Sequence, residues 1–331
     1  MNNQPNLNAR APSPTRRRWL FWLRLLTGGL LTATLVGYLG NVFFLFELFS
    51  HFAVQYAVLA ALLLVGGLYL RSGWLITMSS LSLLLNGLIV SPWLTVAESG
   101  SARQRDLRVL HANVLYDDTD TASIMRLVRS QAPDIFVLQE MTFGSIQGVS
   151  ALKTTYPYQY HIWSKGPCRI LVGSRTPIRP DSALARPTRV VSLKTTVRGR
   201  ELVLLSVHPQ TPTLPSMFAD RNQQLAFVAD NARRQRLPTL LVGDLNISVF
   251  SPVYRRIFQP FFVSSRLTAC RRGFGLQPTW PRFLPPMFIP IDHAFVNEGF
   301  RTVDFRTIDQ PGSDHKAVVV DVSFADAPVR S

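Results

Sequence analysis

The chain is poor in cysteine and contains no internal repeat. Its 331 residues include only two cysteines, Cys168 and Cys270, and neither stands in a Cys-x-x-Cys or Cys/His pattern. Structural zinc sites and thioredoxin-type chemistry are therefore not expected. Oxidation of the two thiols to a disulfide and two separate thiols are both compatible with the sequence.

Charged residues are scarce before residue 106 and common after it. The whole chain carries 35 Lys and Arg against 20 Asp and Glu, a formal net charge of +15. Residues 106 to 331 hold 27 of the basic and 18 of the acidic residues, an excess of nine positive charges. This balance favours anionic partners such as nucleic acid, lipid headgroups or phosphorylated substrates. A basic surface kept for solubility, or for lying on anionic lipid, explains it equally well.

Three long apolar runs fill most of the first hundred residues. They cover roughly Leu20 to Leu39, Phe52 to Leu70 and Trp74 to Leu94, and each is close to the about 20 residues that a helix needs to cross a bilayer. We predict three transmembrane α-helices within residues 19 to 96. A cleaved signal peptide over residues 16 to 40 is disfavoured, because the run is long, lacks a clear cleavage site and is followed by two more.

Basic residues beside these runs predict their orientation. Four of them precede the first run: Arg10, Arg16, Arg17 and Arg18. Residues 40 to 51 carry no Lys or Arg, and Arg71 lies in the next turn. The positive-inside bias puts the N-terminus in the cytoplasm. Three crossings of a bacterial inner (plasma) membrane then place the rest of the chain on the extracytoplasmic, periplasmic side, although arginines that follow the last run weaken this placement.

Composition divides the remaining chain into short polar segments and one large domain. Residues 1 to 18 are predicted to be a disordered cytoplasmic tail, because their first part is rich in Asn, Pro and Ser. Residues 97 to 105 read as a polar linker and residues 326 to 331 as a second tail. The segment between them, residues 106 to 325, is long enough for one substantial core.

Within that domain, short apolar runs end in polar residues. Seven runs read as buried strands, at residues 107–113, 134–140, 168–174, 201–208, 239–246, 289–296 and 317–324. Helical patterns lie between them at Thr121 to Gln131 and Pro215 to Arg236. The alternation predicts an α/β domain with the sheet inside and the helices outside.

Polar side chains gather where these strands pass into loops. They are Asn113, Glu140, His208, Asp244, Asn246, Asp292, Asp314 and His315. Loops held at the edge of a rigid sheet commonly build sites. Asp244 and Asn246 are two residues apart, so on extended backbone their side chains point to the same side. Carboxylate, amide and imidazole groups together can hold a hard divalent cation and activate water, which predicts a hydrolase of phosphoesters.

The order and spacing of these motifs resemble the endonuclease/exonuclease/phosphatase superfamily, whose fold is DNase I-like. The resemblance covers about residues 106 to 325 and rests on Asn113, Leu138-Gln139-Glu140, Ser206-Val207-His208, Gly243-Asp244-Leu245-Asn246, Ile291-Asp292-His293 and Gly312-Ser313-Asp314-His315. It implies a four-layer α/β/β/α sandwich, here preceded by three transmembrane α-helices. The layout is similar to the membrane-anchored bacterial branch that includes a teicoplanin-resistance protein acting on polyprenyl pyrophosphate.

Three of these residues are candidate metal ligands. A carboxylate at the end of an apolar strand is costly unless it is paired or bound to metal, so Glu140 is the expected main ligand. Asn113 is expected beside it as a neutral oxygen ligand, and Asp314 to complete the set. Because the proposed ligands are all oxygens, Mg²⁺ or Mn²⁺ is favoured over zinc. A surface Glu and a turn-forming Asn are the structural alternatives.

The remaining residues are candidates for the chemistry itself. His315 is the expected general base, because imidazole titrates near neutral pH, and the resemblance pairs it with Asp292 as its orienting carboxylate. Asp244 and Asn246 are expected to position the attacking water and bind phosphate oxygen. His208 is expected to donate a hydrogen bond to the phosphoryl group as charge develops there.

Two weaker candidates for contact with the substrate phosphate are Arg175 and His293. Arg175 lies in a stretch like the family's Ser-Arg-x-Pro segment, but a surface arginine is commoner. His293 fits an extra phosphate contact and core packing equally well. His111 is given no role, because a satisfied buried histidine is the usual explanation. The Pro-rich segment 281 to 290 is expected to be a loop over the site.

Together these features predict a membrane-anchored, divalent-metal-dependent phosphoesterase that cleaves a phosphate ester or pyrophosphate at the membrane surface. Membrane tethering favours a lipid-linked phosphorylated substrate. An envelope endonuclease or exonuclease is the alternative, supported by the basic domain, with nucleic acid as its partner. A catalytically inactive module that binds phospholipid is an alternative of another class, which the complete set of polar residues disfavours.

Overall fold

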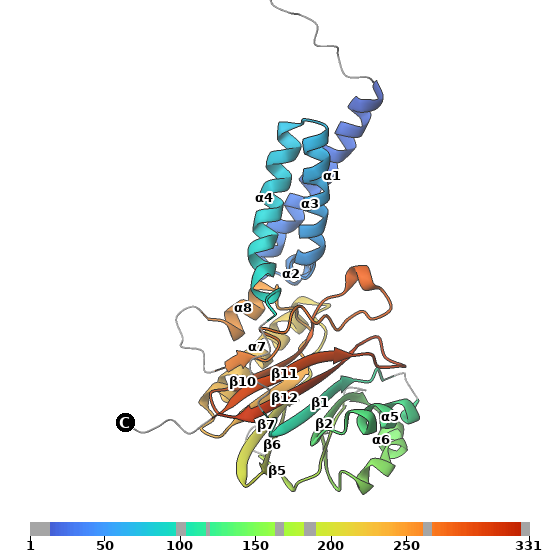
Figure 1. Cartoon of the computed structure of the whole chain (residues 1–331), viewed down its shortest axis with the longest axis vertical. Coiled ribbons are helices and arrows are strands. Elements are labelled where there is room, and N and C mark those ends of the chain that lie inside the picture. Colours follow the sequence, from blue (N-terminus) through green and yellow to red (C-terminus); the bar gives the residue numbers. More distant parts are fainter. Residues whose placement is uncertain are drawn as a thin grey trace, which may run out of the picture.

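The computed structural model describes residues 14–96, 104–116, 120–162, 169–181, 190–260 and 267–325. In Figure 1 a bundle of helices stands on one side of a β-sandwich. Cys168, most of the two predicted tails and most of the predicted linker lie outside the described residues, whereas Cys270 is buried with a free thiol.

The bundle consists of four helices and one short 3₁₀ turn. They are α1 (Pro14–Tyr38), α2 (Phe44–Ser50), α3 (Ala53–Tyr69), α4 (Gly73–Val90) and η1 (Ser91–Trp93). Two segments, Pro14–Tyr38 and Gly73–Trp93, are long and apolar enough to cross a membrane. The helix α3 has 17 residues and qualifies only together with α2, from which it is bent by 57°. Because α1 starts at Pro14, the predicted N-terminal tail is wrong over residues 14 to 18.

One end of the bundle contacts the sandwich. The start of α1 and the turn between α3 and α4 lie at the far end, whereas α2, the start of α3 and the end of α4 lie next to the sandwich (Figure 1). Ala53, Val90 and Trp93 from this near end belong to the same apolar cluster as residues of the sandwich. The bundle is therefore docked onto the sandwich by a shared core.

The sandwich contains two six-stranded sheets. The first has the order β11-β12-β1-β2-β4-β3 and is built from β1 (Leu107–Asn113), β2 (Ile135–Met141), β3 (Tyr158–Ile162), β4 (Arg169–Ser174), β11 (Phe300–Ile308) and β12 (Ala317–Phe324). The second has the order β5-β6-β7-β8-β10-β9 and is built from β5 (Ile178–Pro180), β6 (Val190–Val197), β7 (Arg200–Val207), β8 (Thr239–Asp244), β9 (Leu267–Ala269) and β10 (Asp292–Asn297).

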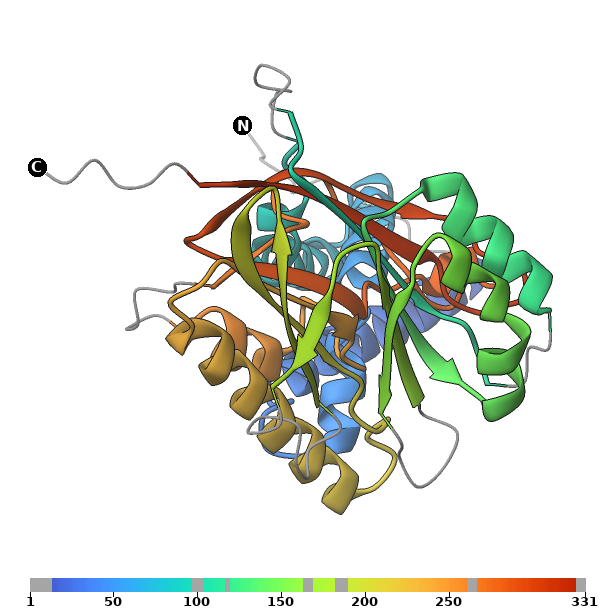
Figure 2. The same ribbon diagram turned by 90° about the horizontal axis from the view of Figure 1, so that it is seen from below.

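Helices cover the outer face of each sheet, as Figure 2 shows. The first sheet is covered by α5 (Thr121–Gln131), α6 (Phe143–Gly148) and η2 (Ser150–Thr154), and the second by α7 (Pro215–Arg234) and α8 (Pro252–Phe258). A further turn, η3 (Pro285–Met287), lies in a long loop before β10. The four-layer α/β/β/α sandwich is confirmed. The helix predicted at residues 121 to 131 has the predicted bounds, and α7 ends two residues early.

Strand alternation divides the apolar residues between three cores. Val109 of β1, Val137 of β2 and Val242 of β8 point between the sheets, where they form one cluster with valines of β12. Their chain neighbours point outward and pack under the helices, as Leu110 does beneath α5 and Leu241 beneath α7. Because side chains alternate along a strand, every second residue of each central strand faces the other sheet.

The seven predicted strands are present with small changes in their bounds. The largest change is at β10, which starts at Asp292 because the residues before it belong to the loop. The sequence analysis gave no bounds for five further strands: β3, β5, β6, β9 and β11. Two of these are only three residues long, and β6 and β11 mix apolar and polar residues without the continuous apolar run of a buried strand.

Candidate active site

The predicted site residues lie at one edge of the two sheets because of strand direction. The strand pairs β1/β2 and β7/β8 are parallel, so their carboxyl ends meet at the same edge of each sheet. The strands β10 and β12 run antiparallel to these neighbours and contribute their amino ends instead. Asp292 at the start of β10 thereby stands directly opposite Asp244 at the end of β8.

Alternation turns most of these side chains toward the space between the sheets. Asn113, His208, Asp244 and Asp292 each continue the series of residues that faces the inter-sheet core. Apolar side chains fill that space along the strands, and polar side chains replace them at its end. The site is therefore the polar end of the inter-sheet core.

Glu140 reaches the site through a local irregularity. Regular alternation would point it outward, with Phe136 and Leu138, toward the helices that cover the first sheet. The register of β2 against β4 shifts between Gln139 and Met141, and Glu140 itself has φ 61°. A bulge of this kind re-aims one side chain, and a non-glycine residue in the left-handed region is strained. This strained backbone brings the carboxylate of Glu140 to the site.

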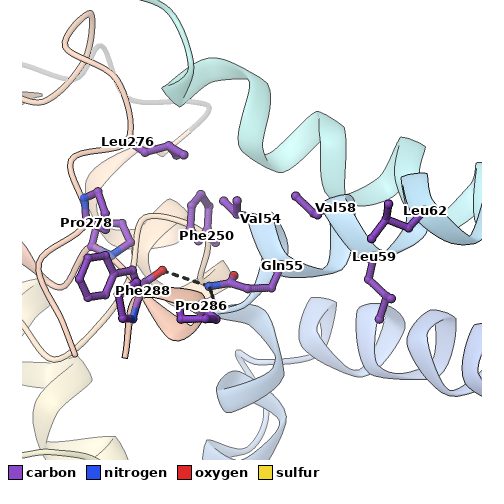
Figure 3. A pocket seen from close by; sticks show the side chains of 12 residues that line it. Val54, Gln55, Val58, Leu59, Leu62, Phe250, Leu276, Pro278, Pro286 and Phe288 are labelled. Carbon is purple, nitrogen blue, oxygen red and sulfur yellow. Dashed lines mark hydrogen bonds between the residues drawn. The ribbon is translucent and has the colours of Figure 1, made fainter. Parts of the chain in front are cut away.

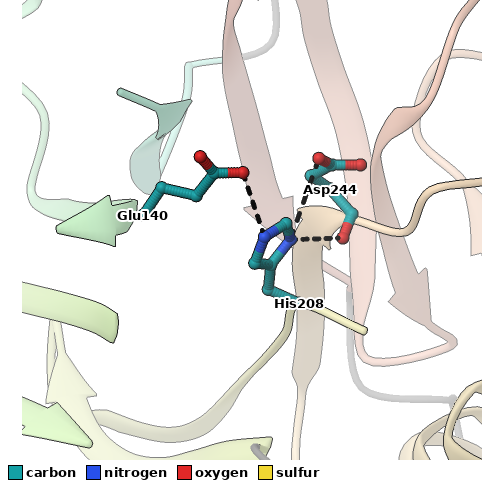
Figure 4. Close-up of side chains that lie close together, drawn as sticks. All are labelled: Glu140, His208 and Asp244. Carbon is teal, nitrogen blue, oxygen red and sulfur yellow. Dashed lines mark hydrogen bonds and ion pairs between the residues drawn. The ribbon is translucent and has the colours of Figure 1, made fainter. Parts of the chain in front are cut away.

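Glu140, Asn113 and His208 form the first of two linked groups. Asn113 Nδ2 donates to Glu140 Oε1 at 2.8 Å and to Asp244 Oδ2 at 3.1 Å. His208 Nε2 lies 3.3 Å from Glu140 Oε1, and its Nδ1 lies 3.3 Å from the Asp244 carbonyl oxygen (Figure 4). Burial disfavours the charge on Glu140, but the hydrogen bond and attraction of His208 outweigh it and lower the pKa of this carboxyl to about 2.

Asp292, His315 and His111 form the second group. His315 Nδ1 lies 2.9 Å from Asp292 Oδ2, and His111 Nε2 lies 2.9 Å from Asp292 Oδ1. Burial opposes ionisation of Asp292, but the two imidazoles hold its pKa well below its ordinary value. An ionised carboxylate only accepts, so both imidazole nitrogens that face it donate. This arrangement fixes the ring of His315 with Nε2 turned toward Asp244, 3.8 Å from its Oδ2.

Asp244 connects the two groups. Its Oδ2 accepts from Asn113 and faces His315, and its Oδ1 accepts from the Asn246 N–H at 2.8 Å. Burial and the nearby charge of Asp292 raise the pKa of Asp244. Burial also opposes the charged form of His315, but attraction to Asp292 prevails and raises the pKa of this imidazole to about 9. The site therefore concentrates negative charge that a cation would offset.

Asn246 and Asp314 stand at the margin of this site. Asn246 has φ 51°, and its Nδ2 donates to the Pro209 carbonyl at 3.0 Å. Asp314 Oδ2 accepts from Trp280 Nε1 at 2.7 Å, and its Oδ1 lies 3.9 Å from His315 Nε2. Within the described part of the chain, this buried Oδ1 atom has no hydrogen-bond partner. It is an acceptor that a ligand could use.

The structure does not bring Arg175 to the site. Ser174 pairs with Ile135 at the start of β2, whereas Arg169 pairs with Met141 at the site end of that strand. Arg175 thus lies about 20 Å from the site edge, at the strand rise of about 3.3 Å per residue. Its guanidinium lies over the ring of Tyr156. The suggested contact between Arg175 and a phosphate held at this edge has no support in the fold.

His293 belongs to the core, as the core-packing interpretation of the sequence predicted. It alternates with Asp292 and points to the helix side of the second sheet, where its ring packs 5.2 Å from Tyr254 and 5.8 Å from Phe295. Its Nε2 bonds to the Ile247 carbonyl at 2.8 Å. Burial, with a smaller effect of Arg271, lowers the pKa of this imidazole to about 3. His293 is a neutral packing residue and not a phosphate contact.

Sequence reasoning missed two residues that hold the site together. His111 fixes Asp292, and the only signal for it was its position two residues before Asn113 on the same strand face. Gln139 is fully buried; its Oε1 accepts from the Asp244 N–H at 3.0 Å, and its Nε2 donates to the Val207 carbonyl at 3.1 Å. It joins β2 of one sheet to β7 and β8 of the other.

Gly243 is required because the Val207 carbonyl and the Gln139 amide leave no room for a side chain. A Cβ atom at this position would lie 2.2 Å from the Val207 carbonyl oxygen and 2.9 Å from Gln139 Nε2. Real Cβ atoms do not approach other atoms so closely, so a side chain here would displace the Val207 carbonyl of the neighbouring strand β7 and the Gln139 amide that bonds to it. The glycine of the Gly-Asp-Leu-Asn motif therefore has a packing function.

The donor set fits a divalent cation. Two sets of three side chains have ligand atoms within 4.8 Å of one another: Glu140 with His208 and Asp244, and Asp244 with Asp292 and His315. Carboxylate oxygens dominate both sets, as hard cations require. The unpartnered Oδ1 atom of Asp314 adds one further oxygen next to His315.

Comparison with known proteins agrees with this geometry. The family model of the endonuclease/exonuclease/phosphatase family matches residues 110–315. Comparison with curated proteins finds no match. Among solved structures, a humanized Danio rerio TDP2 has a TM-score of 0.56 at 14% identity, covering 66% of this chain and 98% of that one. An endonuclease/exonuclease/phosphatase from Beutenbergia cavernae has a TM-score of 0.53 at 23% identity, covering 68% and 73%.

A third solved structure, D. rerio TDP2 complexed with a single-stranded DNA product, has a TM-score of 0.54 at 15% identity, covering 66% of this chain and 98% of that one. At these identities the solved structures establish the fold. The family match spans more than half of the chain and includes every residue of the two linked groups. The chain therefore belongs to the endonuclease/exonuclease/phosphatase family and is a metal-dependent hydrolase of the phosphodiesterase or nuclease type.

Proposed function

We propose that this protein is a membrane-anchored phosphoesterase that cleaves a lipid-linked phosphate ester or pyrophosphate at the bilayer surface. The observation that carries this proposal is the attachment of the helix bundle to loops that border the site. Gln55 of α3 donates to the carbonyls of Pro286 and Phe288 in the loop that leads to Asp292. With the bundle in the bilayer, these contacts hold the site at the membrane surface, so a substrate held in the bilayer reaches it most readily.

A second attachment reaches the strand that carries Asp244. Arg221 of α7 pairs with Glu47 of α2 at 2.6 Å and donates to the Asn246 carbonyl at 2.9 Å. Ser251 donates to the other oxygen of Glu47 at 2.7 Å. These contacts are buried, so the bundle and the catalytic loop form one packed unit. We extend the proposal to residues 19 to 96 as the membrane unit and 106 to 325 as the catalytic unit.

We place the catalytic unit outside the cytoplasm. The arginine-rich start of α1 and the turn with Arg71 share the far end of the bundle, and positive charge at one end favours that end for the cytoplasm. The sandwich lies at the other end. A reporter enzyme that is active only outside the cytoplasm, fused after Ser331, should be active, and activity of a cytoplasm-dependent reporter in its place would reverse this assignment.

In the proposed reaction, water attacks phosphorus in line with the leaving group. Asp292 holds His315 with Nε2 beside Asp244, and in the neutral imidazole, the form that a bound cation would favour over the imidazolium, this nitrogen can accept the proton of the attacking water. Asn246 positions that water and a phosphate oxygen, and His208 donates a hydrogen bond to the phosphoryl group. The carboxyl of Asp292 does not transfer the proton; it stabilises the imidazolium that forms.

Glu140, Asn113 and Asp314 are the proposed ligands of Mg²⁺ or Mn²⁺. When bound there, such an ion would polarise a phosphoryl oxygen and offset the negative charge of the leaving group. The bulge that strains Glu140 supports this assignment, because it directs the carboxylate to the site instead of to the helix side.

The test compares two phosphate substrates on the full chain in detergent. With Mg²⁺, the wild-type protein should release phosphate from polyprenyl pyrophosphate and leave plasmid DNA intact. Glu140→Gln should lower the rate roughly a thousandfold, as loss of a group that stabilises the transition state does. The matched control is Glu201→Gln, because Glu201 is an exposed glutamate of the same sandwich.

Three results would contradict the proposal in different ways. DNA nicking without lipid turnover would make the protein a nuclease, which the single-stranded DNA product bound to a structural neighbour makes the second candidate. Lipid binding without turnover, unchanged in Glu140→Gln, would make it a binding module. Turnover that survives both a chelator and Glu140→Gln would remove the metal-dependent mechanism.

A further inference from the structure

An apolar pocket lies where the helix bundle meets the catalytic loops. It has a volume of about 550 Å³, which is within the range of pockets that hold small ligands. One wall is the helix α3, and the other is formed by the loop residues Leu276, Phe288 and Pro290 (Figure 3). Its lining is almost entirely apolar, which favours a hydrocarbon as its occupant.

The helical wall of the pocket is a stripe that continues along α3 away from the sandwich. Val54, Val58 and Leu62 stand four residues apart on one face of the helix, a rise of about 12 Å. Val58 and Leu62 are 57% and 65% exposed. A groove with this direction follows the axis of the helix, which is also how a lipid chain lies beside a membrane-spanning helix.

The loop wall of the pocket leads directly to the active site. Pro290 lines the pocket, and Asp292 is two residues further along the chain, about 7 Å away at strand spacing. On the other segment, Pro278 lines the pocket, and Trp280 donates to Asp314. The two segments pair through Trp280 and Ile289. Headgroup chemistry at the site and a chain in the pocket are thus within the reach of one molecule.

The pocket is held open by hydrogen bonds across its base. Gln55 lines it and donates to two carbonyls of the opposite loop, those of Pro286 and Phe288, both at 3.1 Å (Figure 3). Prolines at 278, 285, 286 and 290 stiffen that loop. A site that is formed before the ligand arrives loses less conformational entropy on binding.

We propose that this pocket binds the first segment of the hydrocarbon chain of the lipid phosphate that is cleaved at the site. The proposal rests on the lipid-linked substrate proposed above and adds where its chain lies. The pocket acts as a specificity site: it anchors substrates with a long chain and gives no advantage to soluble phosphates with the same headgroup.

The test fills the pocket from its exposed wall. Val58→Trp places a large ring in the groove at a position where the side chain is exposed, so that folding is spared. The matched control is Val65→Trp, because Val65 stands seven residues further along the same face of α3, is 65% exposed and does not line the pocket. Both variants are compared with wild type on polyprenyl pyrophosphate and on methyl pyrophosphate, a short substrate that has the same headgroup and no chain long enough to enter the pocket.

Val58→Trp should lower kcat/KM for the long substrate roughly tenfold, the usual scale of discrimination in an apolar pocket, and leave the short substrate unchanged. Val65→Trp should change neither. Equal losses on both substrates, or equal effects of the two variants, would overturn the pocket assignment.

Crosslinking separates this inference from the proposed function. A long-chain alkyl phosphate with a diazirine near its headgroup, photolysed with the full chain in nanodiscs, should label α3 between Val54 and Leu62 or the loop from Leu276 to Pro290. Labelling there without phosphate release would contradict the proposed reaction but support the pocket as the binding site of the chain. Labels spread over α1 and α4 instead would contradict the pocket assignment, whether or not phosphate is released.

Discussion

Several buried hydroxyls of the helix bundle bond within their own helix, whereas the polar groups of the active site bond across the whole domain. Thr27, Thr34 and Ser79 each donate to the carbonyl four residues earlier in their own helix. At the active site, the partners of Asp292 and Asp244 include His111, 181 residues away, and Gln139, 105 residues away. The three helix hydroxyls thus need only their own helix, whereas the site exists only when both sheets are in place.

At the junction between the bundle and the sandwich, buried polar groups also bond to partners that are distant in the chain. Glu47 and Arg221 are both about 1% exposed and bond across 174 residues. Glu47 lies at the near end of the bundle, where the bundle packs on α7 and on the loop that follows β8. Polar contacts with large expected effects therefore sit at the site and at the junction, and those with small effects sit within the helices.

The largest effect is expected at the site. Asp292→Asn should leave the fold intact but lower kcat roughly ten-thousandfold, because an amide can hold His315 in the wrong tautomer, as it does in comparable triads. Steady-state hydrolysis by the full chain measures this loss. Asp220→Asn, at an exposed aspartate of α7, should act like wild type. A reduction of less than about tenfold would show that Asp292 does not orient the catalytic imidazole.

An intermediate effect is expected at the junction. Glu47→Gln should lower the free energy of unfolding by about 3–5 kcal/mol, because it leaves the Arg221 guanidinium buried without its partner. Thermal unfolding in detergent measures it. Replacing both residues with Leu and Met should recover most of the stability. As a control, Asp230→Asn removes the partner of Arg233 in a surface pair on α7 and should lower the free energy of unfolding by at most about 0.5 kcal/mol. An equal loss for Asp230→Asn and Glu47→Gln would show that the buried junction pair matters no more than a surface pair.

The smallest effect is expected inside the bundle. Thr34→Val removes the acceptor of the Asn86 amide, a bond of 2.9 Å between α1 and α4, and should cost about 0.6 kcal/mol, the average for such bonds in membrane bundles. Thr27→Val loses only a bond within its own helix and should cost less. The same unfolding assay ranks the two. If Thr34→Val destabilised the protein as much as Glu47→Gln, the bundle would depend on long-range polar contacts too.

Local pattern in the sequence was enough to predict the elements with strong periodicity. The seven apolar runs became strands, and the helix at residues 121 to 131 was predicted with its bounds, because its cap, Asp120, and its buried face are both local features. The outer apolar runs became helices able to span a membrane. The site residues could be named because each lies at or beside an end of a strand and matches a family motif.

Other features could not be read from local pattern. The bulge that re-aims Glu140, the contact of His111 with Asp292 and the docking of Glu47 on Arg221 depend on residues that are distant in the chain. The misplaced expectation for Arg175 has the same origin, because a motif does not show at which end of a strand its residue lies.

The amino-acid sequence by itself determined which segments are helices and strands, which face of each strand is apolar and which chemical groups stand at strand ends, since these follow from side-chain periodicity and propensity. Only the tertiary structure decided which of those groups meet and which polar groups join the bundle to the catalytic loop. It also placed the apolar pocket beside the site. These features depend on strand order and direction, and periodicity carries no information about either.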